Sequence, residues 1–445
     1  MTTEVEPEQG KAVRETRLLY PGMGLLFVAI TCCFLIWGVA ADLTTPMVAG
    51  FRRIFDMSTF QASLVQLAYY GAYFLLAIPA SLINARFGYK AGLTVGLGLA
   101  ALGSFAFYPA SQIMTYGAFL AALFAIAAGC SILETSANPY VISLGPEETG
   151  TRRLNFAQAF NPVGTNLGVL LAAVFILPKL DAEVNASAMS AEQLRQVRAD
   201  QLTAVMGPYI GLGVALVAIL IIIAVVKEPE IREEFPDAGD TSSAGAVLGQ
   251  LWRNRHYRYG VIAQFFNVAA QVCTWTYIIQ YTQQAINGSL QLGGYLLQVS
   301  LLVFLVSRFI MTWVIGKVRA TIVLLVLGAL AVALCLFAMV SPNMAGVAAV
   351  VGLSFCLSLM FPTIYGVALK GLGPATKFGA AGLVMAIVGG AIMPLVQGRV
   401  LDSTSPAISF IVPAVCYGVV TCYALFDLKA KRQPIGGHPA AAPAE

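Results

Sequence analysis

The feature that most constrains this sequence is a succession of twelve long apolar runs, separated by short polar stretches. A membrane-spanning helix needs about 20 mostly apolar residues, and each run reaches that length. The runs cover residues 23–48, 60–83, 90–111, 115–144, 154–178, 204–226, 258–285, 291–315, 320–341, 343–369, 377–399 and 406–427. Only 11% of the 445 residues are charged, whereas a soluble domain carries roughly 25%. The sequence therefore predicts an all-α membrane protein with twelve transmembrane helices.

The longest polar interruption divides these runs into two sets of six. It extends from residue 227 to 258 and is rich in Pro, Gly, Ser and charged residues. A second polar insert, at 180–201, is expected to form a surface amphipathic helix between the fifth and sixth runs. We therefore expect the following parts: an N-terminal six-helix half over 1–227, a cytoplasmic linker over 228–257, a C-terminal six-helix half over 258–428 and a disordered cytoplasmic tail over 429–445.

Lysine and arginine in short loops predict which side of the membrane each loop occupies, because cytoplasmic loops are enriched in them. One side collects most of these residues: Lys11, Arg14, Arg17, Arg86, Lys90, Arg152, Arg153, Lys317, Arg319, Lys370, Lys377, Lys429, Lys431 and Arg432. The other side has Arg52, Arg53, the 180–201 insert and Arg399. Both termini and the linker are therefore expected in the cytoplasm. Residues 1–17 lack the apolar core of a cleaved signal peptide, so the first run should remain as a span.

The sequence lacks the signatures of several other classes of protein. The eight cysteines all fall inside apolar runs, without CxxC spacing, and the chain has only two histidines. No basic patch interleaved with aromatic residues indicates nucleic-acid binding. A nucleophile elbow, paired intramembrane aspartates and a phosphate-binding glycine loop are all missing as well. The sequence therefore predicts no cofactor, no metal site, no nucleic-acid partner and no enzymatic activity.

Two carboxylates stand out well inside the apolar runs, Glu134 in the fourth and Asp42 in the first. Ionisable residues inside spans are energetically costly and mark ion or substrate pathways by default. Desolvation disfavours the charged form of a carboxylate, so such a group can take up and release a proton near neutral pH. These two residues are the candidates for proton coupling. The structural alternatives are satisfaction by neighbouring hydroxyls for Glu134, and capping of a helix broken before Pro46 for Asp42.

Polar and aromatic residues also form stripes along three runs at helical spacing. The fifth run contributes Gln158, Asn161 and Thr165, the seventh Gln264, Asn267, Gln271 and Trp275, and the second Gln66 and Tyr73 with Tyr69 or Tyr70. Amides both donate and accept hydrogen bonds, which suits sugar hydroxyls, and aromatic faces suit the apolar face of a pyranose. Each stripe alone is also compatible with hydrogen bonding between helices. Because amides from both halves accompany a carboxylate, the pattern favours a sugar site. Arg308, deep in the eighth run, has no partner that sequence can identify.

Two levels of family resemblance agree with this interpretation. The six-plus-six plan and the segment INARFGYKAG at 83–92 resemble the major facilitator superfamily, with Asn84 where an aspartate is usual. Members of that superfamily bind substrate near the membrane midplane between two halves. The segments LETSANPYVISLGPE and RLNFAQAFNPVGTNLG resemble the fucose–galactose–glucose proton symporter family. Segments in the second, seventh, eighth and tenth runs are similar to its L-fucose branch.

The resemblance implies roles for individual residues. Glu134 matches the family's substrate-linked glutamate, and Gln158 and Asn161 match its sugar-contacting amides. Asn138 lies in the same motif, and Phe361, before Pro362, is expected to line the cavity. Thr45 stands where the L-fucose branch has its proton-coupling aspartate. Asp42 comes three residues earlier, on a neighbouring part of the same helix face.

The resemblance also implies an activity: proton-coupled uptake of a neutral monosaccharide, L-fucose or a related hexose, by alternating access. Its partners would be the sugar, protons and membrane lipid, and it would act as a monomer in the bacterial inner membrane. The alternative, prompted by the Thr45 departure, is a sugar uniporter without proton coupling.

Overall fold

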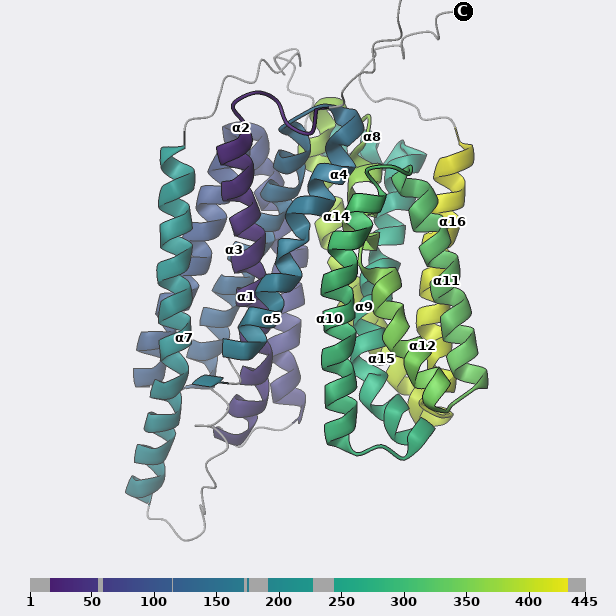
Figure 1. The fold of residues 1–445 in the computed structure, drawn as a ribbon. Coiled ribbons are helices and arrows are strands. Elements are labelled where there is room, and N and C mark those ends of the chain that lie inside the picture. Colours follow the sequence, from purple (N-terminus) through teal and green to yellow (C-terminus); the bar gives the residue numbers. More distant parts are fainter. Residues whose placement is uncertain are drawn as a thin grey trace, which may run out of the picture.

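The computed structural model describes residues 17–54, 59–113, 115–171, 174–175, 191–226 and 244–430, and every regular element in these ranges is helical (Figure 1). The first set of helices comprises α1 (Gly24–Ile54), α2 (Thr59–Ile113), α3 (Tyr116–Ser143), α4 (Glu147–Gln158), α5 (Phe160–Leu171) and α7 (Ala191–Val225). The short helix α8 (Ala244–Arg253) precedes the second set. That set comprises α9 (Arg255–Ile286), α10 (Leu290–Val314), α11 (Ala320–Val340), α12 (Met344–Leu357), α13 (Met360–Leu369), η3 (Gly373–Ala375), α14 (Thr376–Met385), η4 (Ala386–Val388), α15 (Gly389–Ser403), η5 (Ile408–Phe410) and α16 (Ile411–Lys429).

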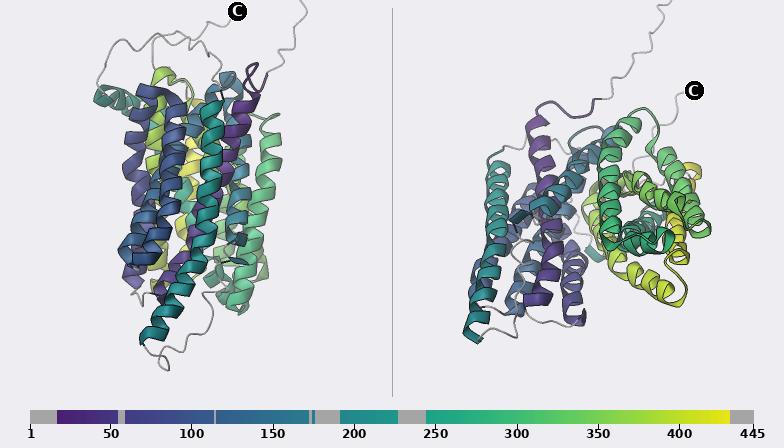
Figure 2. Two further views of the ribbon diagram at one scale, coloured as in Figure 1. Left: turned by 90° about the vertical axis from the view of Figure 1, so that its left-hand side faces the viewer. Right: turned by 60° about the horizontal axis from the view of Figure 1, so that its bottom comes forward.

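The described helices account for twelve membrane crossings. By length and apolar composition, nine segments within the described residues are able to cross a membrane. One of them, Ala68–Ile113, has 46 residues and is long enough for two crossings. The α4–α5 pair, interrupted at Ala159, and α9, which carries several amides, supply the other two. The twelve-helix prediction is therefore confirmed, and the two sets form two bundles that stand side by side (Figure 2).

Gly88 divides α2 into its two crossings. Its backbone has φ +83° and ψ 166°, a conformation that residues other than glycine adopt only under strain. Asn84, one turn before this break, fastens α2 to α3. Its Nδ2 donates to the carbonyl of Thr135 at 3.3 Å, and the hydroxyl of Ser136 donates to its Oδ1 at 2.8 Å. The residue that replaces the usual aspartate therefore makes a neutral connection between two helices.

Two helix starts differ from the sequence-based expectation. From Ala191 onward, the second polar insert is part of α7, which continues without interruption into the sixth crossing rather than forming a separate surface helix. Residues 180–190 lie outside the described part of the chain. The seventh crossing starts at Arg255, before the predicted residue 258, because the Asn254 side chain caps it by accepting from the backbone N–H of Tyr257 at 3.2 Å.

Small residues bring neighbouring helices of the N-terminal half into main-chain contact. A side chain on Gly38 of α1 would overlap the carbonyl of Asn161, and one on Gly164 of α5 would overlap the carbonyl of Leu35. Gly96 of α2 also lies close to the backbone of α3 near Leu133, although less closely than the first two glycines lie to theirs. Glycine at helix interfaces is the usual device for such close packing in membranes. The α1–α5 and α2–α3 pairs are therefore tightly joined.

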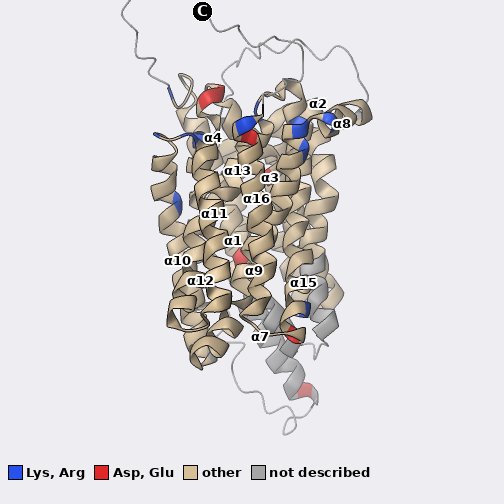
Figure 3. Ribbon diagram, turned by 90° about the vertical axis from the view of Figure 1, so that its right-hand side faces the viewer, with Lys and Arg blue, Asp and Glu red and all other residues tan. Residues whose placement is uncertain are grey.

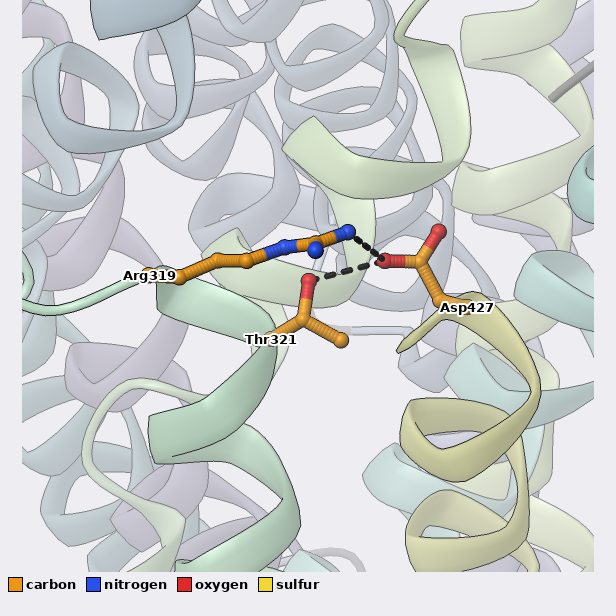
Figure 4. Close-up of polar contacts among 3 residues, drawn as sticks. All are labelled: Arg319, Thr321 and Asp427. Atoms are coloured by element: carbon orange, nitrogen blue, oxygen red, sulfur yellow. Dashed lines mark hydrogen bonds and ion pairs between the residues drawn. The ribbon is translucent and has the colours of Figure 1, made fainter. Parts of the chain in front are cut away.

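Both ends of the described chain lie at the same end of the molecule, which we call the terminal end. Arg153 anchors the N-terminal segment there by donating from Nη1 to the carbonyl of Leu18 at 2.8 Å. At the end of α16, Asp427 lies 3.8 Å from Arg319 Nη2 and accepts from the Thr321 hydroxyl at 2.8 Å (Figure 4). Most of the Lys and Arg of the described residues lie at this end, as does α8 (Figure 3).

The two halves are in direct contact at the terminal end. The backbone N–H of Gly371, after α13, donates to Glu147 Oε1 on α4 at 2.8 Å. The ammonium group of Lys377 lies 5.7 Å from the centre of the Tyr89 ring. The main apolar core follows the same pattern, because it extends from the N-terminal half into α13, α14 and η4, whereas a second core lies within the C-terminal half. The halves are therefore closed against each other at this end.

Candidate functional site

Glu134 lies near the middle of α3 with its carboxylate entirely buried. Neither carboxylate oxygen has a hydrogen-bond partner among the described residues. The hydroxyls around it are engaged elsewhere: Thr135 donates to the carbonyl of Ser131, and Ser131 donates to the carbonyl of Tyr73. The structural alternative, in which neighbouring hydroxyls satisfy this carboxylate, therefore does not hold in the described part of the chain. A buried carboxylate without such partners is suited to carry a proton or to bind a ligand.

Two amides form a pair beside this carboxylate. Gln158, the last residue of α4, donates from Nε2 to Oδ1 of Asn138 at 2.7 Å, and both side chains are buried. Asn138 lies one turn after Glu134 on α3, close enough for its amide to interact with the carboxylate, although the two do not reach hydrogen-bond geometry. Its Nδ2 has no partner among the described residues. The pair therefore presents an unused donor next to an unused carboxylate.

Aromatic side chains of α1 and α2 complete this group. The indole N–H of Trp37 donates to the Tyr73 hydroxyl at 2.7 Å, and the hydroxyls of Tyr69 and Tyr73 are 3.4 Å apart. The Tyr73 hydroxyl lies within electrostatic range of Glu134. We refer to Glu134, Asn138, Gln158 and Tyr73 as the Glu134 cluster. The structure thus brings together four residues that the sequence analysis proposed separately.

Asp42 occupies a second position in the N-terminal half. It is half-buried on α1, within reach of the Thr165 side chain on α5 and within electrostatic range of Tyr69 and Tyr70 on α2. It therefore points into the bundle. The helix-cap alternative is wrong, because α1 continues unbroken through Asp42 to Ile54. The side chain of Thr45 lies outside the described residues.

The C-terminal half contributes amides of a different character. Gln264 and Asn267 on α9 are fully buried, and both polar atoms of each amide lack partners among the described residues. Gln271, further along the same face, is half-buried. Unpaired buried amides are costly, so these groups are suited to accept a ligand or water. Their orphaned donors and acceptors match what sugar hydroxyls offer.

Of the other residues proposed for the site, some already make hydrogen bonds within the protein, and one has a side chain outside the described residues. Asn161 donates to the main-chain carbonyl of Phe34 at 3.3 Å, and the Trp275 indole donates to the Ser354 hydroxyl at 3.0 Å. Both side chains therefore help to hold helices together in this state. Phe361 is half-buried on α13. The side chain of Gln66 lies outside the described residues.

Sequence reasoning missed two residues of the site. Tyr365, fully buried on α13, lies within electrostatic range of Glu134 and interacts with Asn138, so it belongs to the C-terminal half but reaches the Glu134 cluster. The sequence did offer a signal for Tyr365, because it comes four residues after Phe361 and so lies on the same helix face. The two rings stack, with their centres 6.1 Å apart. Trp37 carried no comparable signal, because a tryptophan in an apolar run is equally suited to lipid or core packing.

Taken together, the arrangement offers a protonatable group and neutral hydrogen-bonding groups from both halves. Within the described residues, no three His, Cys, Asp or Glu side chains lie close enough together to hold a metal ion. The chemistry on offer is therefore reversible protonation and recognition of a neutral, hydroxylated molecule.

Comparison with known proteins places this arrangement in a family. Residues 25–396 match the family model of the Major Facilitator Superfamily. The chain belongs to the major facilitator superfamily. It is 40% identical over 410 residues to the L-fucose-proton symporter of Haemophilus influenzae, covering 89% of this chain and 95% of that one. A glucose/galactose transporter of Brucella abortus is 32% identical over 419 residues, covering 92% and 95% of the two chains.

A solved structure supports the same assignment. A crystal structure of the major facilitator transporter FucP in the outward conformation matches with a TM-score of 0.85 and 35% identity, over 90% of this chain and 98% of that chain. The resemblance to the fucose–galactose–glucose branch of the superfamily is therefore confirmed over nearly the whole length of the chain.

Proposed function

We propose that this chain is a secondary transporter, not an enzyme, which imports a neutral monosaccharide together with protons by alternating access. L-fucose or a related hexose is the proposed cargo. The observation that carries the proposal is the Glu134 cluster: a buried carboxylate and a buried amide donor, both without partners among the described residues. The identity to an L-fucose-proton symporter over most of both chains supports this reading.

In this proposal Glu134 takes up a proton and binds the sugar together with Asn138 and Gln158. A protonated carboxylic acid can donate a hydrogen bond to a sugar hydroxyl, whereas a carboxylate can only accept one. Protonation and sugar binding therefore favour each other at the same position. Gln264 and Asn267 close the site from the other half, because the sugar supplies the partners that their amides lack.

Asp42 is the second proposed proton carrier. It lies within range of Tyr69, whose hydroxyl is 3.4 Å from that of Tyr73, so hydroxyl groups lie between the two carboxylates. This placement keeps an acidic group in the N-terminal core although the family position is Thr45. We therefore favour symport over the uniporter alternative.

The described state supports an orientation and a place in the cycle. We propose that the terminal end faces the cytoplasm, since basic residues gather there, and that the protein is a multi-pass monomer of a bacterial inner membrane. The proposed division into halves is 1–227 and 258–428 with a linker over 228–257, although the seventh crossing itself already begins at Arg255. Their closure at the terminal end supports an outward-facing state, in agreement with the outward conformation of the matched crystal structure.

The test is sugar-induced pH change in lightly buffered vesicles that contain the protein. L-fucose, galactose, glucose and N-acetylglucosamine are added in turn, and external pH and sugar entry are recorded together. External alkalinisation with one sugar, lost in Glu134→Gln, is the expected result. Sugar entry without any pH change would favour the uniporter, and failure of all four sugars in both measurements would refute the proposed cargo class.

A further inference from the structure

Arg308 lies deep in the eighth crossing and is almost completely buried. No carboxylate lies within ion-pair distance of it among the described residues. Its guanidinium instead donates from Nη1 to the main-chain carbonyl of Gln158 at 3.1 Å, and from Nε to the main-chain carbonyl of Ser358. It also lies 4.5 Å from the centre of the Phe304 ring. A buried cation in a membrane is costly, so these carbonyls must provide much of its stabilisation.

The two carbonyls have one property in common: each lies four residues before a proline. In a regular helix, the carbonyl of Gln158 would accept from the N–H of residue 162 and that of Ser358 from the N–H of residue 362. Both of these residues are proline, which has no N–H. Arg308 therefore supplies the donors that Pro162 and Pro362 remove.

The two carbonyls belong to opposite halves of the protein. Gln158 ends α4 in the N-terminal half, whereas Ser358 lies between α12 and α13 in the C-terminal half, like Arg308 itself. A guanidinium is a planar fork with five N–H donors, so it can serve two acceptors at once. The nearby rings of Phe160 on α5 and Phe309 on α10 are in contact, with centres 5.7 Å apart. The two halves therefore also touch beside this link.

We propose that Arg308 is a positioning residue that ties the two proline-broken helices together across the halves and must release Gln158 during each transport cycle. The carbonyl it holds belongs to the residue whose side chain bonds Asn138 beside Glu134. The tie therefore sets the position of the Glu134 cluster relative to the C-terminal half. It also stabilises the described state over any state in which the halves have rotated apart at this level.

The experiment measures the equilibrium between states without sugar, so its outcome does not depend on the proposed cargo. Phe87 and Trp313, two exposed residues at the terminal end in opposite halves, are each changed to cysteine and spin-labelled. The exposed Cys32 and Cys422 are changed to serine. In full-length protein in lipid nanodiscs, the distance distribution should contain a short component from the described state and a longer one from the opened state.

Arg308→Met should shift the ratio of these components roughly tenfold toward the longer distance, since a hydrogen bond to a charged group is worth about that factor or more. Arg308→Lys, which keeps the charge but loses the fork, should shift it in the same direction by less, and carries the test if Arg308→Met does not fold. Arg399→Met, on an exposed arginine of α15, is the control and should leave the ratio unchanged. An unchanged ratio in folded Arg308→Met and Arg308→Lys would overturn the proposal.

A double-mutant cycle tests the role of the prolines. Pro162→Ala restores an N–H that competes for the Gln158 carbonyl, so the shift caused by Arg308→Lys should be at least about threefold smaller in that background. Pro208→Ala, in α7, changes a helix-interior proline with no link to Arg308, and its effect should simply add. Additive effects with Pro162→Ala as well would overturn the assignment of the proline-freed carbonyl.

Discussion

The two halves treat their buried polar groups in different ways. In the N-terminal half, three polar contacts of the site are made inside the half: Gln158 with Asn138, Asn161 with the carbonyl of Phe34, and Trp37 with Tyr73. In the C-terminal half, the amides of Gln264 and Asn267 have no partners among the described residues. The comparison indicates that the N-terminal half is organised before the ligand arrives. Under the proposed function, the amides of Gln264 and Asn267 would gain their hydrogen-bond partners when the ligand binds.

The largest effect should come from Glu134, an N-terminal group that breaks this pattern because both of its carboxylate oxygens lack partners among the described residues. Glu134→Gln keeps the size of the side chain but cannot exchange a proton, so concentrative uptake should fall to passive equilibration. Binding of the sugar should persist within about tenfold, because an amide still offers hydrogen bonds. Uptake against a gradient and equilibrium binding are measured in parallel. Undiminished accumulation in this variant would contradict the assigned role.

The contrast between the halves is tested most sharply by paired substitutions. Asn267→Leu should weaken sugar binding by roughly 10- to 100-fold while leaving the melting temperature of the sugar-free protein equal or higher, because it removes an unpaired buried amide. Gln158→Leu should weaken binding and also lower the melting temperature, since it leaves Asn138 Oδ1 without its donor. Equal losses of thermal stability in both variants would show that the halves do not differ in the way described.

Asp42 provides a test of where the second carboxylate has to be. Asp42→Asn should reduce the proton-driven accumulation of sugar by roughly severalfold, because Glu134 would then be the remaining proton carrier. The double variant Asp42→Asn with Thr45→Asp restores the arrangement typical of the L-fucose branch and should recover accumulation. Proton-to-sugar stoichiometry is measured in all three proteins. Full coupling in the single variant would remove Asp42 from the mechanism.

The smallest effects should separate the two tyrosines. Tyr73→Phe loses a 2.7 Å hydrogen bond from Trp37, whereas Tyr69→Phe loses only a 3.4 Å contact. Tyr73 also belongs to the Glu134 cluster, so its hydroxyl is a proposed ligand contact, and the loss of one hydrogen bond to a ligand costs about 1 kcal/mol, or roughly fivefold in affinity. We therefore expect about fivefold weaker binding for Tyr73→Phe and less than about twofold for Tyr69→Phe. The opposite order would mean that Tyr69 is the tyrosine that contacts the ligand.

The sequence allowed the crossings to be placed because apolar length and polar interruptions determine them directly. It also identified Glu134, Gln158 and Asn138, through both the cost of polar groups in lipid and the family motifs. The pairing of these residues was not predictable, since it depends on how α3 is rotated against α4. The partners of Arg308 were not predictable either, because they are main-chain carbonyls, which every residue type has. Pro162 and Pro362 were nevertheless visible, and each marks a carbonyl that needs a donor.

The close contact of α1 with α5 has a mechanical consequence. Gly38 and Gly164 bring the two backbones so close that a side chain at either position would overlap the facing carbonyl, so the two helices pack as a tight pair. Asp42 is carried by α1 and Asn161 by α5. Asp42 and Asn161 are therefore expected to move together as parts of one rigid unit. The spacing between the carboxylate and the amide should then stay constant throughout the transport cycle.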